Sequence, residues 1–263
     1  MVAAGPDEIE SAEAALRRQA AAALHRRRVG PNRVLVYGSF SSDRAAAVAV
    51  DALRADGWPA VARPLTGGHL TVWQKHTAPI AIDGRVQICF PWSEASRHVG
   101  PPTVEIDPGR GFGTGSHPTT RLVLRQLVSR LRPGDSVLDV GSGSGVLAVV
   151  AARLGASQVT AVDIHPEALL ASRRNAARNG VADRVRVTDA PLTALPVRYD
   201  VVLANIACQV LVGLADAIVQ RLRPGGWLGL SGLSPAQVSV VQAAYRPLGV
   251  VEERRDDDWV ALV

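Results

Sequence analysis

Residues 137–155 read VLDVGSGSGVLAVVAARLG, and this stretch decides the fold. An apolar run ends around Asp139, three alternating glycines follow, and the chain continues as an apolar segment of helix length. Glycines are required where a backbone turns tightly and where a ligand must approach that backbone closely. The stretch therefore predicts a buried strand, a ligand-binding turn at Gly141, Gly143 and Gly145, and a helix.

Short apolar segments alternate with segments of helix length from residue 103 to the end of the chain. The expected strands are 136–141, 158–164, 184–189, 200–206 and 227–232, and the expected helices are 144–154, 166–179, 209–222 and 235–246. Strands that are apolar throughout are buried on both faces, and their alternation with helices gives a parallel, doubly wound sheet. The tail at 250–263 predicts an antiparallel edge hairpin. The expected fold class is α/β, with a Rossmann-like domain over residues 101–263.

A small α+β module is expected over residues 1–100. Residues 8–28, rich in alanine and charge, predict a helix, so that residues 1–30 form a helical extension. The other expected elements are strands at 33–40, 69–74 and 85–90 and a helix at 42–58. A connector bounded by proline and glycine, residues 91–102, leads into the second domain.

The composition limits the classes of protein and partner. The chain has 263 residues and is 47% hydrophobic, but no apolar run reaches membrane-spanning length, and the N-terminus lacks the apolar centre of a signal peptide. The net charge of +5 is not concentrated in one segment, and the run His25–Arg28 is typical of a solvated helix end. Cys89 and Cys208 have no metal-site spacing. We therefore expect a cytoplasmic protein with no membrane partner, no direct nucleic-acid binding and no metal.

The strand that follows the glycine turn ends in Asp163, 22 residues after Gly141. An acid at this place accepts hydrogen bonds from ribose hydroxyls, both in dinucleotides and in S-adenosylmethionine. Dinucleotide fingerprints place the third glycine three residues after the second, whereas here it follows by two. The acid Asp139, two residues before the first glycine, also favours S-adenosylmethionine as the cofactor.

The later strands end in polar residues as well. The third strand ends in Asp189 and Ala190, which suit an adenine edge, and the fourth ends in Asn205. Ligands of open α/β sheets bind at the carboxyl ends of the strands. Four strand ends with suitable residues indicate one binding site along this edge.

A second glycine-rich segment, GRGFGTGSHPTTR, occupies residues 109–121. Its glycines allow backbone angles closed to other residues, so the segment is able to wrap tightly around a ligand. We expect Phe112 to lie against cofactor or substrate, and Thr119 and Thr120 to supply hydroxyl groups at the start of the next helix. His117 is a candidate proton acceptor, although a structural hydrogen bond explains it equally well.

The segments EIDPGRGFGTGSHPTTR, DVGSGSGVLAVVAARLGA, VDIHPEALLASRRNAARNG and ANI together resemble the PrmA-type methyltransferases. These are seven-strand class I enzymes that methylate amino groups of ribosomal protein L11. The resemblance covers residues 79–263. It implies S-adenosylmethionine as the cofactor, a ribosomal protein as the substrate, and a loop at 109–121 that folds over the cofactor.

The resemblance and the strand-end pattern together define the candidate site. The resemblance places Thr120, Gly141 and Asp163 against the cofactor and Asn205 next to the transferring methyl, where it orients a neutral amine. Methyl transfer from a sulfonium is mainly a matter of alignment, so such an orienting group is central. The candidate catalytic residues are Asn205 and His117. The candidate cofactor-binding residues are Phe112, Gly113, Thr114, Gly115, Thr120, Asp139, Gly141, Gly143, Asp163, Ile164, Asp189, Ala190 and Asn205.

Two departures from the family keep other functions open. The family continues Asn-Ile-Leu-Ala after the fourth strand, whereas this chain has Ala207, Cys208 and Gln209 after Ile206. The family's ferredoxin-like substrate-gripping domain is only partly matched, and residues 1–30 have no evident counterpart. The alternatives are a methyltransferase that tailors a small molecule or peptide, a dinucleotide-dependent oxidoreductase, and a non-catalytic protein that binds the cofactor.

Overall fold

The computed structural model describes residues 1–19, 23–30, 33–39, 43–62, 79–92, 101–107, 115–256 and 258–263. The chain forms two compact units, Met1–Trp73 and Gln74–Val263. The strand expected at 69–74 lies outside the described residues. Across the part that is described, every helix is too short or too polar to cross a bilayer.

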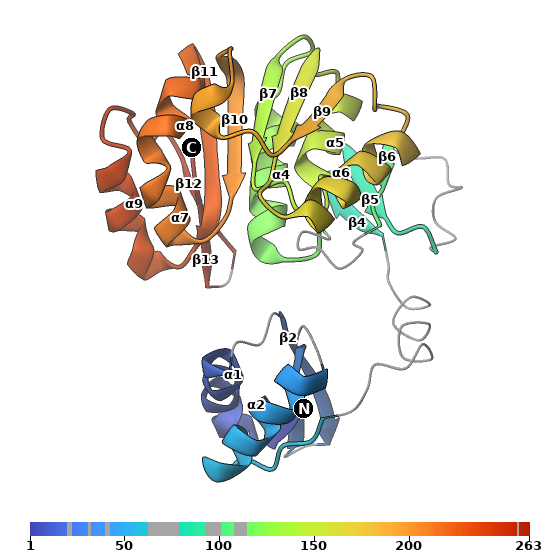
Figure 1. Cartoon of the computed structure of the whole chain (residues 1–263), viewed down its shortest axis with the longest axis vertical. Coiled ribbons are helices and arrows are strands. Elements are labelled where there is room, and N and C mark those ends of the chain that lie inside the picture. Colours follow the sequence, from blue (N-terminus) through green and yellow to red (C-terminus); the bar gives the residue numbers. More distant parts are fainter. Residues whose placement is uncertain are drawn as a thin grey trace. The chain divides into compact units, whose positions relative to one another are not determined.

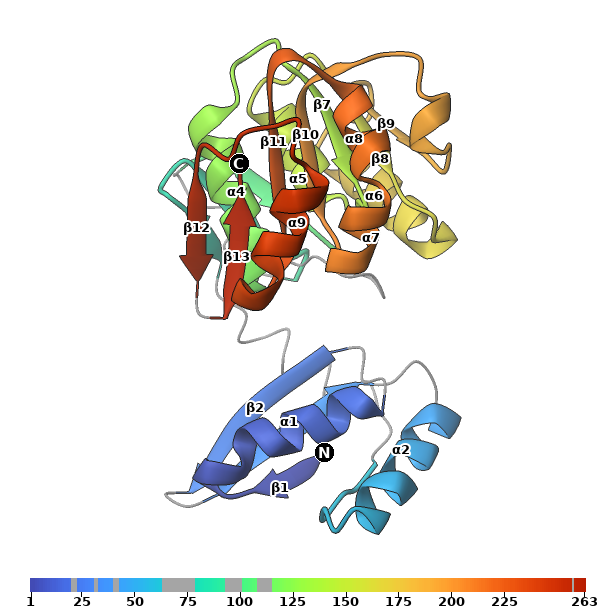
Figure 2. The ribbon, with the colours of Figure 1, turned by 90° about the vertical axis from the view of Figure 1, so that its left-hand side faces the viewer.

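Unit 1 is an antiparallel sheet with two helices (Figure 2). Its elements are β1 (Val2–Ala4), a 3-10 helix (Pro6–Glu8), α1 (Ile9–Arg18), β2 (Ala23–Gly30), β3 (Arg33–Ser39) and α2 (Asp43–Ala55). The strand order is β1-β3-β2, and Ala60 bridges Val2 in antiparallel fashion. Counting this bridge as a fourth strand position, the order along the chain is β-α-β-β-α-β, which is the ferredoxin-like arrangement.

The predicted helix at 8–28 is wrong beyond Arg18. Residues Ala23–Gly30 form a strand that pairs with β3, with His25 opposite Tyr37 and Arg27 opposite Leu35. Residues 1–30 are therefore the first half of the unit and not a helical extension, and the run His25–Arg28 is not a helix end. The helix propensity of alanine and arginine is a weak preference, which pairing with the central strand β3 overrides.

Unit 2 contains a seven-stranded sheet in the order β12-β13-β11-β10-β7-β8-β9 (Figure 1). Its strands are β7 (Ser136–Val140), β8 (Gln158–Val162), β9 (Val185–Thr188), β10 (Tyr199–Asn205), β11 (Leu222–Leu233), β12 (Glu253–Asp256) and β13 (Trp259–Leu262). The five adjacent strands β11, β10, β7, β8 and β9 are parallel to one another. At the other end of the sheet, β13 is antiparallel to both of its neighbours, β11 and β12. The predicted α/β fold with an edge hairpin is confirmed.

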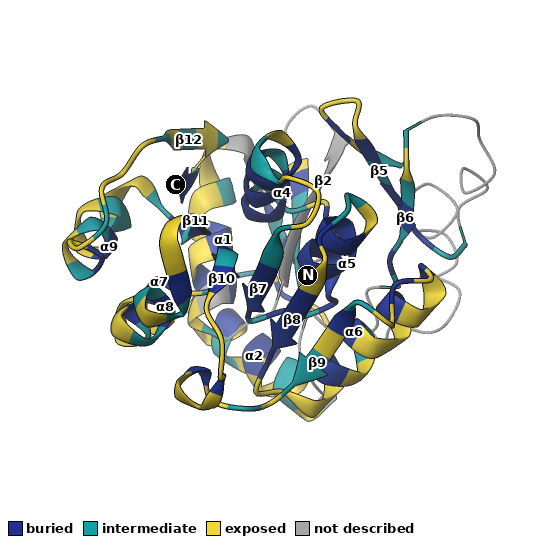
Figure 3. Ribbon diagram, turned by 90° about the horizontal axis from the view of Figure 1, so that it is seen from above, coloured by how far each residue is buried: buried dark blue, intermediate teal, exposed yellow. Residues whose placement is uncertain are grey.

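Helices cover both faces of this sheet. They are α4 (Pro118–Arg130), α5 (Val146–Arg153), α6 (Pro166–Arg178), α7 (Cys208–Gly213), α8 (Ala215–Arg221) and α9 (Val238–Ala244), with 3-10 turns at Leu192–Ala194 and Pro235–Gln237. Successive residues of a strand pack on opposite faces of the sheet. Val137 is in the core with α4, α5 and α6, whereas Leu138 is in the core with α7, α8 and α9. In Figure 3, α5 is almost wholly buried, whereas α6 shows solvent an exposed side. The single helix predicted at 209–222 is two helices.

A second, smaller sheet explains where the units divide. Its strands are β4 (Ile80–Ile82), β5 (Val86–Cys89) and β6 (Thr103–Glu105). Ile82, Ile88 and Val104 are buried in the same core as α4 and α5. Because this apolar surface is part of the core of unit 2, the division falls between Trp73 and Gln74. The sequence pattern predicted a division after residue 100.

Candidate active site

Three polar side chains share one face of the sheet. Asp139 follows Val137, Asp163 follows Ala161 and Asn205 follows Leu203, each by two residues, and the three apolar residues belong to the core under α4, α5 and α6. Side chains two apart along a strand point to the same face. The polar groups therefore meet at the carboxyl ends of β7, β8 and β10, where the strand order reverses and open α/β sheets bind ligands.

The glycine turn after β7 is held against the ends of β8 and β10. The Gly141 and Ser142 amides donate to the Val162 carbonyl at 2.8 and 3.0 Å. Gly141 has φ +75°, and a Cβ there would lie 2.2 Å from Cγ2 of Ile206. Only glycine satisfies both the left-handed backbone and this close approach.

Asp163 braces the turn with both of its carboxylate oxygens. Oδ2 accepts from the Gly143 amide at 2.9 Å, and Oδ1 accepts from the His165 amide at 3.0 Å. Each oxygen retains a second lone pair, so the carboxylate is still able to accept from ligand hydroxyls. The next residue, Ile164, is 81% exposed, which leaves an apolar surface beside the acid for a flat ligand ring.

Asp139 is a fully buried acid at the base of the turn. Its Oδ2 accepts from the Ala148 amide at 3.2 Å, and its Oδ1 has no hydrogen-bond partner among the described residues. Burial raises the pKa of Asp139 to about 7, the Ala148 hydrogen bond opposes this rise, and the nearby Asp163 charge adds to it. A buried carboxylate oxygen without a partner suits a cationic ligand group.

We expect Asp139→Asn to stabilise the ligand-free protein above pH 7 by a few kcal/mol and to leave its stability near pH 4 unchanged. The pKa of Asp139 is about 7 when folded and 3.8 when unfolded, so the folded state holds the proton more tightly. Wild-type stability from this group therefore falls as pH rises from about 4 to about 7. Urea denaturation at several pH values measures the difference, and a pH-independent difference would contradict the assignment.

Asn205 is anchored to α4. Its Nδ2 donates to Oγ1 of Thr120 at 3.2 Å, and Thr120 is buried in the first turn of that helix. This bond uses one amide hydrogen and fixes the plane of the Asn205 side chain. The amide oxygen is then the group that remains to accept a hydrogen bond from a substrate.

His117 caps the same helix. Its Nδ1 lies 2.8 Å from Oγ1 of Thr119 and accepts from the Thr119 amide at 3.4 Å, while its ring meets the Trp259 ring edge-on at 5.0 Å. Burial, and then the charge of Arg121, lower the pKa of His117. The imidazole is therefore neutral at neutral pH, and its role as a proton acceptor stays a prediction.

Three of the remaining candidate residues, Asp189, Ala190 and Gly115, lie among the residues that the structure describes. Asp189 is exposed just after β9, and the Ala190 amide donates to Oγ1 of Thr188 at 3.1 Å. Gly115 is buried with φ +85°, and a Cβ there would lie 2.9 Å from Cδ1 of Ile88. Phe112, Gly113 and Thr114 lie outside the described residues.

The sequence reasoning missed a set of buried polar side chains on α6. Ser172, Asn175 and the C-cap residue Asn179 contact the glycine turn and residues 105–107 at the end of β6. The signal was present, because the three residues recur at helical spacing within the helix expected at 166–179. Trp259, beside His117, was also missed.

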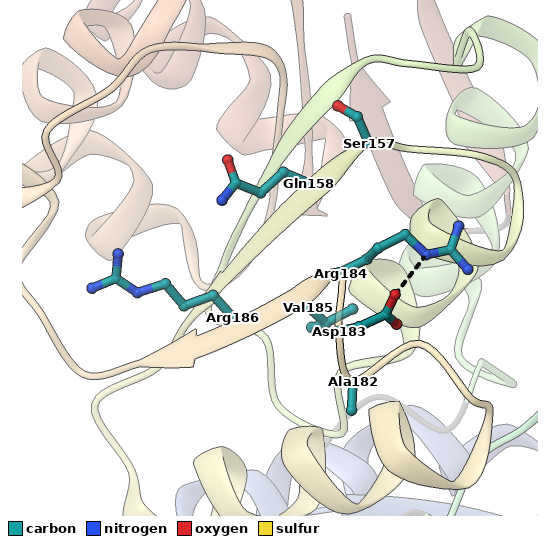
Figure 4. A pocket seen from close by; sticks show the side chains of 7 residues that line it. All are labelled: Ser157, Gln158, Ala182, Asp183, Arg184, Val185 and Arg186. Carbon is teal, nitrogen blue, oxygen red and sulfur yellow. Dashed lines mark ion pairs between the residues drawn. The ribbon is translucent and has the colours of Figure 1, made fainter.

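A surface hollow of about 480 Å³ lies at the opposite edge of the sheet (Figure 4). Gln158 and Val185, the first residues of β8 and β9, line it together with the Asp183–Arg184 ion pair at 4.0 Å. The amino ends of parallel strands lie away from the ligand edge. This hollow is therefore not the candidate site.

Comparison with known proteins identifies the family. The family model "Ribosomal protein L11 methyltransferase (PrmA)" matches residues 69–263. The chain is 42% identical over 196 residues to a ribosomal protein L11 methyltransferase of Citrifermentans bemidjiense, covering 72% of this chain and 64% of that protein. It is 46% identical over 193 residues to the protein of the same name in Thiobacillus denitrificans, covering 72% and 63%.

A solved structure agrees with this match. The crystal structure of ribosomal protein L11 methylase from Lactobacillus delbrueckii subsp. bulgaricus is similar with a TM-score of 0.66 and 27% identity, covering 71% of this chain and 97% of that one. The match to the curated relatives spans about 64% of their length. From residue 69 onward, the chain belongs to the PrmA family of ribosomal protein L11 methyltransferases.

Proposed function

We propose that the protein is an S-adenosylmethionine-dependent methyltransferase that methylates amino groups of a ribosomal protein. The observation that carries this proposal is the gathering of Asp139, Asp163 and Asn205 on one face at the carboxyl edge, around the glycine turn. Membership of the PrmA family supports it, since the matched relatives are named for this activity.

The residues present suit the cofactor. In this proposal, the remaining lone pairs of Asp163 accept from the ribose hydroxyls, and the exposed Ile164 side chain packs against the adenine ring. The unpartnered Oδ1 of Asp139 suits the positive charge of the cofactor's amino acid part. When bound, S-adenosylmethionine supplies a methyl group on a positively charged sulfur.

Asn205 does the orienting in this proposal. Its amide oxygen accepts from the acceptor amine and fixes the direction of the amine lone pair, while Thr120 holds the amide plane. The amine must be neutral to react, and His117, which caps α4 and whose pKa is lowered by burial, is a candidate for its proton. Cys208 is buried at the start of α7, whereas Ala207 and Gln209 on either side of it are exposed and change the surface beyond Asn205.

We expect Asp163→Ala to raise the dissociation constant for S-adenosylmethionine by about 10-fold to 100-fold. The substitution removes the ribose acceptor and releases the Gly143 and His165 amides. Titration calorimetry measures the change. Asp183→Ala, an exposed acid at the opposite edge, is the matched control and leaves affinity unchanged. Unaltered affinity in Asp163→Ala would refute the ribose role.

The acceptor is tested with purified ribosomal protein L11. Incubation with S-adenosylmethionine and the wild-type protein is expected to add methyl groups to L11, read by intact-protein mass spectrometry. Binding of NADH in place of S-adenosylmethionine would favour the oxidoreductase alternative. Cofactor binding with methyl transfer only to small molecules would favour the tailoring alternative, and binding with no transfer to any acceptor a non-catalytic role.

Unit 1 enters the proposal as the substrate-recognition module. Its β-α-β-β-α-β order is ferredoxin-like, which is a fuller match to the family's substrate-gripping domain than the sequence pattern indicated. We place the reaction in the cytoplasm, with the ribosomal protein as the partner.

A further inference from the structure

One face of α6 is polar although it is buried. Ser172, Asn175 and the C-cap residue Asn179 are spaced by three and four residues, so they lie on the same side of the helix. Their exposed fractions are 1%, 0% and 9%. Buried polar side chains destabilise a protein unless they are hydrogen-bonded, so their partners define what this face does.

Two of these side chains hold the glycine turn. Ser172 Oγ donates to the Gly143 carbonyl at 3.1 Å, and Asn175 Nδ2 donates to the Ser144 carbonyl at 2.8 Å. A trans peptide is planar, with its C=O and N–H pointing in opposite directions. Fixing the two carbonyls therefore also fixes the amides of Ser144 and Gly145, and the Gly145 amide closes the turn by donating to the Ser142 carbonyl at 2.7 Å.

The approach of α6 to the turn depends on Gly145. A Cβ at this position would lie 2.9 Å from Cα of Ser172, which is backbone of the helix. The distance shows that the turn and α6 are in direct contact, so side-chain bonds between them are short and specific.

The same helix face also holds residues 105–107, the end of β6 and the two residues after it. Asn175 Oδ1 accepts from the Asp107 amide at 2.9 Å, and its Nδ2 donates to the Asp107 carbonyl at 2.9 Å. Asn179 repeats this pattern on Glu105, accepting from its amide at 2.8 Å and donating to its carbonyl at 2.7 Å. Pairing with alternate residues of an extended segment imitates a neighbouring strand.

The two asparagines differ in one respect. The second amide hydrogen of Asn175 goes to Ser144 in the glycine turn, whereas that of Asn179 goes to the Asn175 carbonyl within α6. Both side chains therefore stabilise residues 105–107, but only Asn175 links that segment to the turn.

We propose that Asn175 is a positioning residue for the cofactor: it joins the glycine turn and the segment at Asp107 into one hydrogen-bonded unit. The proposal rests on the proposed function, since it takes the ligand of the turn to be S-adenosylmethionine. Asn175 acts through the Ser144 peptide and does not itself touch the methyl donor.

The test compares Asn175→Ala with Asn179→Ala in the full chain. Each variant loses bonds to residues 105–107, so we expect similar losses of melting temperature. Titration calorimetry with S-adenosylmethionine is expected to give a dissociation constant raised about 10-fold in Asn175→Ala and within about 2-fold of wild type in Asn179→Ala. Steady-state assays should show the same split, with KM for the cofactor raised and kcat retained in Asn175→Ala.

Hydrogen exchange gives a readout that does not depend on turnover. Cofactor binding is expected to slow exchange of the peptide containing residues 105–107 in wild type, because Asn175 couples this segment to the turn. The slowing should disappear in Asn175→Ala. Slowing that persists in this variant would contradict the coupling.

Further outcomes separate the possible failures. Equal weakening of cofactor affinity in Asn175→Ala and Asn179→Ala, or none in either, would overturn the proposal. If Asn175→Ala does not fold, Asn175→Ser replaces it, since a serine has a single hydrogen to donate and is unable to hold Asp107 and Ser144 together, and unchanged affinity there would overturn the proposal. A wild-type protein that fails to bind S-adenosylmethionine would instead refute the proposed function.

Discussion

Replacing Asn205 with alanine is expected to lower kcat by roughly 100-fold while the affinity for S-adenosylmethionine stays within about 2-fold. The amide oxygen of Asn205 is the acceptor that aligns the incoming amine, and its direction is set by the bond to Thr120. An alignment lost in the transition state lowers turnover without weakening ground-state binding of the cofactor. Single-turnover assays with ribosomal protein L11 and separate binding titrations measure the two quantities.

Thr120 provides the control for Asn205. Thr120→Ser keeps the hydroxyl and is expected to retain most of kcat, whereas Thr120→Val removes the acceptor of the Asn205 amide and lowers kcat by about 10-fold. If Asn205→Ala loses affinity and turnover equally, Asn205 binds the cofactor and does not orient the amine.

The second large effect is expected from Gly145→Ala. Gly145 has φ +79°, and the added Cβ would meet Cα of Ser172 at 2.9 Å, so α6 must move away from the turn. The left-handed backbone and the clash together destabilise the fold by about 2–4 kcal/mol. Because α6 also positions the turn, the dissociation constant for the cofactor should rise by about 10-fold or more. Urea denaturation and calorimetry measure the two losses.

Gly180→Ala separates the two causes. Gly180 has φ +66°, but a Cβ there meets nothing within 4 Å. This variant therefore shows only the backbone cost, about 1–2 kcal/mol, and leaves cofactor affinity unchanged. Equal losses in the two variants would contradict the claim that close packing of α6 against the turn matters.

The spacing of residues 137–163 was sufficient to predict a strand, a glycine turn and the end of the next strand, while the role of these residues in cofactor binding stays a prediction. Glycines at alternate positions specify a turn whatever surrounds them, and the acid 22 residues later marks the end of the adjacent strand. The structure adds that Asp163 already bonds to the Gly143 amide, a contact that depends on the distance between two strand ends. The alternation of side chains along each strand was visible in the sequence. Placing Asn205 on the same face as Asp139 also requires the register between β10 and β7, which the sequence does not show.

Other parts were not predictable from local pattern. Residues 23–30 have the composition of a helix, and their strand conformation depends on β3, which is not visible in the segment itself. The division of the units depends on burial shared between Ile88 and the helices of unit 2. The partners of Asn175 lie 68 and 31 residues away along the chain, so no window of sequence contains them.

The measurement that tests the central claim most directly uses purified protein, methyl-labelled S-adenosylmethionine and extract from cells that lack this gene. The extract is separated into protein, nucleic acid and small molecules, and the label is followed. The account predicts label in a single ribosomal protein, and no label with the Asn205→Ala variant over the same time. Label confined to nucleic acid or to small molecules would contradict the account.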